Sequence, residues 1–224
     1  NLVEFPIKEW KGLVFSGTSP SRFDSVFDHL EERLGWIPIE DFQHDESRHR
    51  SYEIEANWAL YVDNYLEGFH IPFVHGDLHE ALDYDSYSTE LFDGGVLQIG
   101  IANDSEDIFE LPESSPDFGK RVAAYYYWIY PGLMLNFYPW GLSVNLVIPI
   151  SVSKTRIVYH GFVWDESKLG KGAGGDLDKV EGEDQEIVEA TQRGVSSSSY
   201  DRGRYSATRE TGVHHFHRMI FDGK

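Results

Sequence analysis

The sequence feature that most constrains the fold is a series of short strand candidates between residues 96 and 164. Their side chains are largely β-branched or aromatic, which is typical of strands. Brief turn sequences such as Pro131-Gly132 and Pro139-Trp140-Gly141 separate them. The candidates are residues 96–101, 122–130, 133–137, 142–150 and 155–164. Strands joined by such short turns pair in antiparallel order, so this region is predicted to form an antiparallel meander.

Helical periodicity flanks the predicted meander on both sides. Apolar side chains recur at helical spacing in residues 23–34, which end at Gly35, and again in residues 58–69. A longer helix is expected over about residues 178–193. A helix, several strands and a final long helix predict an α+β fold. In this fold a curved antiparallel sheet wraps around the long carboxy-terminal helix.

The remaining segments carry weaker signals. Residues 5–15 are expected to be extended, and residues 168–175 to form a glycine-rich loop. Residues 37–50 are polar and are expected to be irregular, with a strand only at 51–55. Near the end, strand alternation would place His215 and His217 on one face and His214 on the other. A surface strand or family-specific packing is therefore favoured over a second metal site there.

Composition excludes several classes of partner. Acidic residues outnumber basic residues 38 to 19, which gives a formal charge of −19. Such a surface would repel nucleic-acid phosphates and anionic lipids, so neither partner is expected. No apolar run approaches the roughly 20 residues of a membrane span, and the first residues do not resemble a signal peptide. The chain is therefore expected to be a cytoplasmic globular protein.

The absence of cysteine excludes disulfides and cysteine-ligated metal clusters within these residues. Histidine is then the most informative residue type, and His70 and His75 lie five residues apart. On a straight helix they would point about 140° away from each other. Pro72 lacks an amide hydrogen and would collide with the carbonyl of Gly68, so the helix is expected to kink after His70. Such a bend would return His75 toward His70, which makes a shared metal ion plausible.

A two-histidine iron site needs one carboxylate to complete a facial triad. The best candidate lies in the acidic segment 183–194. Asp184 shares one helical face with Ile187 and Val188, whereas Glu183 lies mostly off that face. An acid on an apolar face is costly unless it is paired or binds a metal. Asp184 is therefore the favoured ligand, with Glu183 as the alternative.

Together these residues resemble the catalytic domain of the Rieske-type non-haem iron oxygenases, the ring-hydroxylating alpha subunits. The ending of the chain is similar to the choline monooxygenase-like branch of that family. The matching motifs are Asn57-Trp58, Asp63-Asn64, Glu67-x-x-His70-x-x-x-x-His75, Glu183-Asp184, Gln192-Arg193-Gly194, Tyr200-Asp201-x-Gly203-Arg204-Tyr205 and Glu210-x-Gly212-Val213-His214-His215-Phe216-His217.

The resemblance implies a helix-grip fold and a mononuclear Fe(II) held by His70, His75 and Asp184. It also implies O2-dependent hydroxylation of a small organic substrate. Electrons would come from a reductase or ferredoxin through a Rieske [2Fe-2S] cluster. The alternative is a metal-free helix-grip module that binds a ligand in a hydrophobic cavity without redox chemistry.

Further roles follow from the same resemblance. Glu67 would connect the iron site to a Rieske cluster in the neighbouring subunit of a homotrimer, and Asp63 or Asn64 would orient the ligands. The cysteine and histidine ligands of a Rieske cluster are absent, so the cluster is expected on an amino-terminal domain missing from this sequence. Residues 1–36 would be the tail of that domain with a connecting helix, and residues 37–224 the catalytic domain.

The aromatic run 125–130, with Tyr138 and Trp140, supports two interpretations. The rings could form a cation–π cage for an alkylammonium substrate. Alternating aromatic residues in a strand are more often core packing, and packing is therefore the favoured interpretation.

Overall fold

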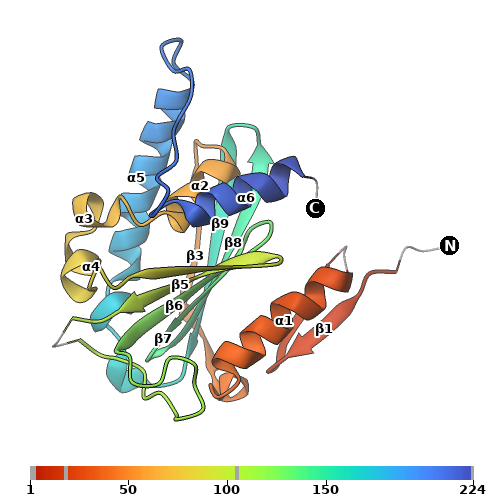
Figure 1. Cartoon of the computed structure of the whole chain (residues 1–224), viewed down its shortest axis with the longest axis vertical. Coiled ribbons are helices and arrows are strands. Elements are labelled where there is room, and N and C mark those ends of the chain that lie inside the picture. Colours follow the sequence, from red (N-terminus) through yellow and green to blue (C-terminus); the bar gives the residue numbers. More distant parts are fainter. Residues whose placement is uncertain (1–3, 18–19, 104–105, 223–224) are drawn as a thin grey trace.

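The computed structural model describes residues 4–17, 20–103 and 106–222, and Figure 1 shows how the elements are arranged. The predicted meander is present within a seven-stranded antiparallel sheet of order β3-β9-β8-β7-β6-β5-β4. From β4 to β9 each strand lies beside the next in sequence, and β3 completes the far edge beside β9. The strands are β3 (Gln43–Ile54), β4 (Ser88–Phe92), β5 (Gly95–Ile101), β6 (Val122–Ile129), β7 (Leu133–Tyr138), β8 (Gly141–Ser151) and β9 (Lys154–Val163).

Helices cover both faces of this sheet. α1 and an amino-terminal hairpin lie on one side, whereas α2, α5 and α6 lie on the other (Figure 1). The helices are α1 (Pro20–Leu34), α2 (Trp58–Leu66), α3 (Ile71–Val74), α4 (Gly76–Ala81), α5 (Leu177–Val195) and α6 (Thr211–Phe221). The hairpin pairs β1 (Ile7–Trp10) with β2 (Leu13–Ser16) and forms a small sheet of its own.

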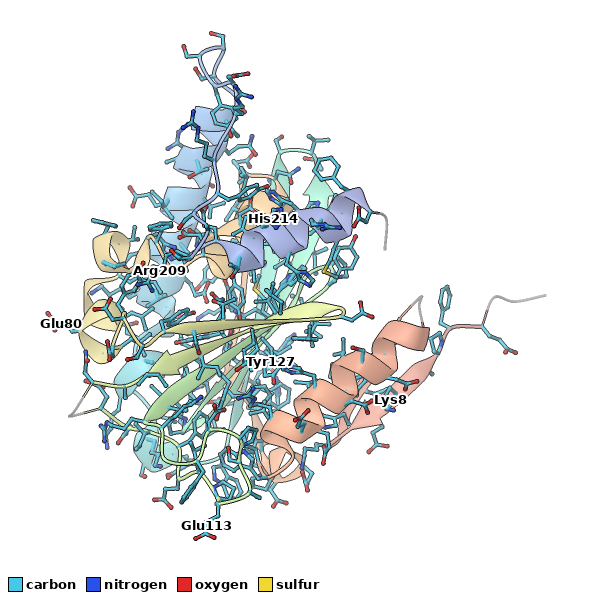
Figure 2. All side chains as sticks on the ribbon, in the orientation of Figure 1. Lys8, Glu80, Glu113, Tyr127, Arg209 and His214 are labelled. Atoms are coloured by element: carbon cyan, nitrogen blue, oxygen red, sulfur yellow. The ribbon has the colours of Figure 1, made fainter. Side chains whose placement is uncertain are left out.

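Side chains alternate between the two faces along each strand. In β6, Tyr125 and Tyr127 pack in the core beneath α1, whereas Trp128 packs with residues of α2 and α6. Tyr127 lies between the sheet and α1, with Lys8 and Glu113 at the periphery (Figure 2). All three β6 rings are fully buried, so most of the aromatic run has the packing role favoured above.

α5 runs along the face opposite α1, and its later turns extend beyond the sheet (Figure 1). Its inward residue Val188 is buried among side chains of α2, α6 and the sheet. Among the described residues, no helix combines the length and the apolar character needed to cross a membrane.

Several segments differ from the sequence prediction. The polar segment 37–50 is not irregular, because β3 begins at Gln43. β3 is an edge strand, and its unpaired edge faces solvent. Polar side chains fit there, so the alternation of apolar and polar residues is weak. A short 3-10 helix, Gly172–Gly174, lies inside the glycine-rich loop 168–175. A second 3-10 helix, Glu166–Lys168, ends at Lys168, the first residue of the loop.

The histidine-rich segment 213–217 is helical, in α6, and the prediction of a strand was wrong. Its inward residues Val213, Phe216 and Met219 recur every three positions, which is helical spacing. A Cβ atom at Gly212 would lie 3.0 Å from the carbonyl oxygen of Leu66. Glycine therefore allows α6 to pass closely against the end of α2, directly before the histidine motif.

Candidate metal centre

The two motif histidines are separated by a bend, but Pro72 does not produce it in the predicted way. α2 ends at Leu66, and Glu67 already has extended dihedral angles (φ −114°, ψ 141°). The helix therefore ends before His70 instead of kinking after it. Pro72 lies in the first turn of α3, where its missing amide hydrogen has no helical partner to lose. The short α3 is what separates His70 from His75.

α5 supplies the carboxylate that faces both histidines. Asp184 Oδ1 lies 3.0 Å from His75 Nε2 and 3.5 Å from His70 Nε2. One ligand atom from each of these residues falls within 4.8 Å of the other two. The imidazole rings are 4.9 Å apart at an interplanar angle of 81°. The structure therefore brings together the three residues that the sequence nominated as metal ligands.

Two further carboxylates hold the other ring nitrogens. His70 Nδ1 lies 2.5 Å from Glu67 Oε1, and His75 Nδ1 lies 2.8 Å from Glu183 Oε2. Since a carboxylate accepts, each neutral ring carries its hydrogen on Nδ1 and a lone pair on Nε2. Both lone pairs then face the negative Asp184 oxygen, which is unfavourable unless a cation lies among them. Glu183, the alternative ligand, thus contacts the outer nitrogen of His75 and not the cluster of ligand atoms.

The geometry of the cluster fits a metal ion. Metal–ligand bonds of about 2.1 Å at right angles place neighbouring ligand atoms about 3 Å apart. The distances of 3.0 and 3.5 Å from Asp184 Oδ1 to the two Nε2 atoms are close to that value. Two imidazoles and one carboxylate are the donor set of the facial triad that binds non-haem Fe(II). The residues present therefore fit the mononuclear iron that the resemblance implies.

His75 is the most buried member of the cluster, with 2% of its surface exposed. Burial lowers its pKa, but the hydrogen bonds and charges of Asp184 and Glu183 outweigh that effect and raise the pKa above its ordinary value. The second proton of His75 would occupy Nε2, the atom that faces the cluster. A proton and a metal ion therefore compete for the same nitrogen.

Two adjacent residues of α2 differ in what they contact. Asn64 Nδ2 donates to Asp184 Oδ1 over 2.6 Å and so orients the carboxylate. Asp63 Oδ1 lies 2.8 Å from Nε2 of His217 on α6, and this hydrogen bond raises the pKa of His217. Of the two residues named for ligand orientation, Asn64 touches the cluster, and Asp63 connects α2 to α6.

A cavity of about 80 Å³ lies beside the cluster. It is walled by helix residues on one side and by the sheet on the other. No lysine or arginine is found among the described residues that line it. Beyond the three cluster residues, the lining includes Tyr61, Asn64, Tyr65, Glu67, Leu82, Tyr87, Gln98, Tyr126, Asn136, Tyr138, Asn145 and Glu181.

Glu181 is a half-buried acid of the cavity wall that the sequence analysis missed. Its Oε2 accepts a hydrogen bond of 2.9 Å from Tyr61 Oη and another from Tyr159 Oη. Burial, followed by the negative charge of Asp184, raises the pKa of Glu181 to about 8. The available signal was its position three residues before Asp184, on the same face of α5.

The fold and this cluster define the class of protein. Residues 40–222 match the family model of the ring hydroxylating alpha subunit (catalytic domain). The chain therefore belongs to that family, as the sequence motifs indicated. Membership of a family of oxygenase catalytic domains does not favour the alternative hypothesis, that the chain is a metal-free ligand-binding module.

Curated relatives place the chain near one branch of the family. It is 35% identical to choline monooxygenase of Arabidopsis thaliana over 184 residues, which cover 76% of this chain and 40% of that protein. It is 28% identical to the carnitine monooxygenase oxygenase subunit of Escherichia coli (strain K12) over 235 residues, or 98% of this chain and 61% of that one. The chain thus spans about 40% of the first relative's length and 61% of the second's.

Solved structures share the fold at low sequence identity. A quaternary ammonium Rieske monooxygenase in complex with L-carnitine matches with a TM-score of 0.70 at 20% identity, covering 97% of this chain and 60% of that chain. Naphthalene 1,2-dioxygenase from Rhodococcus sp. matches with a TM-score of 0.64 at 14% identity, covering 97% and 65%. These likenesses confirm the predicted helix-grip α+β fold.

Proposed function

We propose that this domain hydroxylates a small organic substrate with O2 at a mononuclear Fe(II) held by His70, His75 and Asp184. The observation that carries the proposal is that two Nε2 atoms face one Asp184 oxygen while carboxylates occupy both Nδ1 atoms. Iron held by three protein ligands on one face supplies the redox chemistry of oxygen activation. The protein's own part is to orient the ligands and to position the substrate carbon.

Glu67 is proposed to serve electron delivery as well as ligand orientation. It holds His70 through Nδ1 and is only partly exposed, with 17% of its side-chain surface accessible. The proposed donor is a Rieske [2Fe-2S] cluster in the neighbouring subunit of a homotrimer, reduced by a reductase or a ferredoxin. Asp63 is proposed to support the site by fixing α2 against His217 of α6.

The proposed division of the chain places the end of a Rieske domain and a connecting helix in residues 1–36. The catalytic domain would then occupy residues 37–224. Two observations support this division: the family match begins at residue 40, and the β1-β2 hairpin pairs apart from the main sheet. The cytoplasmic location stays a prediction, since chloroplastic and bacterial proteins are both among the relatives.

The substrate is proposed to be a quaternary ammonium compound. Relatives are named for choline and carnitine, and both molecules carry a quaternary ammonium group. The described cavity wall has no lysine or arginine, contains the Glu181 carboxyl, and presents the rings of Tyr126 and Tyr138. Phenol rings and a carboxyl suit a cation that offers no N–H hydrogen.

Iron content tests the proposal directly. The chain, loaded anaerobically with Fe(II), should retain about one iron per molecule after gel filtration. His70→Ala and His75→Ala should each abolish retention, whereas the matched control His49→Ala, at an exposed strand position, should bind like the parent. Equal iron retention in all four proteins would contradict the proposed centre.

A second experiment tests the chemistry. A longer protein that carries the Rieske cluster would be supplied with a reductase and candidate quaternary amines. Hydroxylated product should form in proportion to the reducing equivalents consumed. Tight ligand binding by the iron-free protein, with no product from the loaded one, would instead favour the metal-free module.

A further inference from the structure

A row of polar residues crosses the sheet on the face that carries the metal centre. Gln98 of β5 pairs with Tyr126 of β6, Tyr126 with Asn136 of β7, and Asn136 with Ser143 of β8. Cross-strand partners point to the same face, so these four side chains form one line across four neighbouring strands. Gln98, Asn136 and Ser143 are all buried. Buried polar side chains are costly unless they are hydrogen-bonded, so each needs a partner.

Tyr65 of α2 fixes the orientation of the two amides in this row. Gln98 Nε2 donates to the carbonyl oxygen of Tyr65 over 2.7 Å, and Tyr65 Oη donates to Asn136 Oδ1 over 2.6 Å. A flipped Gln98 amide would set its oxygen against the Tyr65 carbonyl, acceptor against acceptor. The oxygen of Gln98 therefore has to point away from Tyr65.

That oxygen is an acceptor without a donor. Gln98 is 1% exposed, and among the described residues no hydrogen-bond donor reaches its Oε1 atom. Gln98 also lines the cavity whose wall contains His70, His75 and Asp184. A buried acceptor without a donor, in the wall of a cavity beside the cluster, is suited to receive a hydrogen from a bound molecule.

We propose that Gln98 Oε1 accepts a hydrogen bond from an alcohol group of the substrate and thereby selects hydroxylated cations over their deoxy analogues. The proposal rests on the proposed function, which supplies the quaternary ammonium class. A quaternary ammonium group has no N–H, so the hydrogen must come from another part of the molecule, and an alcohol provides it. Sites that hydrogen-bond a substrate hydroxyl reject analogues that lack it, because their own polar atom is left unpaired.

The test is a binding cycle that changes the protein and the ligand separately. Choline and propyltrimethylammonium have similar size and charge but differ in the hydroxyl group. Their dissociation constants would be measured by calorimetry with the Fe(II)-loaded chain under anaerobic conditions. The parent protein should prefer choline by about 10- to 100-fold. Gln98→Met, which keeps the volume and removes the acceptor, should bring the two affinities within about 3-fold of each other.

A matched control separates recognition from damage to the cavity. Leu82→Met changes another apolar lining residue and leaves the Gln98 amide in place, so it should shift both affinities by the same factor and keep the preference. Gln98→Met should also leave the iron content unchanged, because Gln98 has no contact with the cluster ligands.

The outcomes are distinct for the two proposals. If Gln98→Met still preferred choline, the acceptor role would be overturned. The same would follow if the iron-loaded parent protein bound both ligands equally or bound neither. A preference that is present in iron-free protein and lost in Gln98→Met would support the acceptor role. In that case, failure of the chain to bind iron would overturn the oxygenase proposal and leave the acceptor role standing.

Discussion

The two faces of the sheet differ in the size of the cavity they carry and in its chemistry. The face beneath α1 has a cavity of about 740 Å³, bounded by apolar residues of β2, α1 and the sheet. The face beneath α5 has a cavity of only about 80 Å³, yet its wall includes the three candidate metal ligands, Glu181 and three buried amides. Volume alone would therefore point to the wrong face. Converging polar groups identify the candidate active site.

The faces also differ in what their polar contacts surround. On the α1 face, Leu30, Leu34 and Phe137 are fully buried within one apolar cluster, and Arg33 of α1 pairs with Asp117 and Glu90 at its edge. On the α5 face, apolar packing is combined with hydrogen bonds that connect α2, α5 and the sheet, such as those made by Asn64 and Tyr65. Substitutions on the first face should therefore change stability, whereas substitutions on the second should change metal or ligand binding.

The largest expected effect is the loss of iron from Asp184→Ala. The variant removes the oxygen that faces both Nε2 atoms, so Fe(II) affinity should fall by more than about 100-fold. An anaerobic Fe(II) titration measures this affinity. Glu186→Ala, at an exposed position of the same helix, should bind iron like the parent. Unchanged iron binding in Asp184→Ala would contradict the expectation that the α5 face, unlike the α1 face, governs metal binding.

Leu30→Ala should destabilise the protein without affecting the metal site. Leu30 is fully buried on the α1 face, and truncation of such a residue costs about 2–5 kcal/mol. Urea unfolding would measure the loss, and the Fe(II) affinity of the folded protein should stay unchanged. Leu66→Ala, which empties a buried position directly before Glu67, should lower both stability and iron affinity. A loss of iron affinity in Leu30→Ala would show that the two faces are coupled.

Glu183→Ala should weaken iron binding by about 10- to 100-fold, since it removes the carboxylate that orients His75 through Nδ1. Glu183→Gln keeps an acceptor but loses the negative charge, so its affinity should fall between those of the alanine variant and the parent. If the alanine variant bound iron like the parent, Glu183 would have no role in orienting the imidazole.

The smallest effect should be a change in pH dependence in Glu181→Gln. In the iron-free protein, burial and Asp184 raise the pKa of Glu181 from 4.5 to about 8. Between these values the folded state binds more protons than the unfolded state, so the carboxyl lowers stability as pH rises through this window. The glutamine variant should flatten that decline by about 1 kcal/mol per pH unit or less. Urea unfolding at several pH values measures it, and parallel curves would contradict the buried titration.

Much of the fold could be predicted from local patterns. β5 to β9 and α5 follow directly from alternation and helical periodicity, because their inward faces are apolar. Only the end of β3 could be recognised, as the strand predicted at residues 51–55, because an edge strand does not need an apolar pattern. α6 was mistaken for a strand because its three histidines obscured the apolar spacing of Val213, Phe216 and Met219.

The three residues that come together at the candidate site could be chosen from the sequence, but their surroundings could not. Motif spacing nominated His70, His75 and Asp184, and helical periodicity separated Asp184 from Glu183. Periodicity places a residue on a face of its own helix but does not show which atom of another element it reaches. The contact of Glu183 with His75 Nδ1 therefore needed the structure. The polar row that contains Gln98 likewise becomes visible only when strand register is known.

The two contacts of α5 with the His75 imidazole have a mechanical consequence. Glu183 and Asp184 are consecutive residues, about 100° apart around the helix axis, and they hold opposite nitrogens of the His75 ring. A modest rotation of α5 would draw one carboxylate toward the ring and the other away. The same helix extends beyond the sheet at its far end (Figure 1). A torque applied there would thus be transmitted along the helix as a twist of the His75 ring.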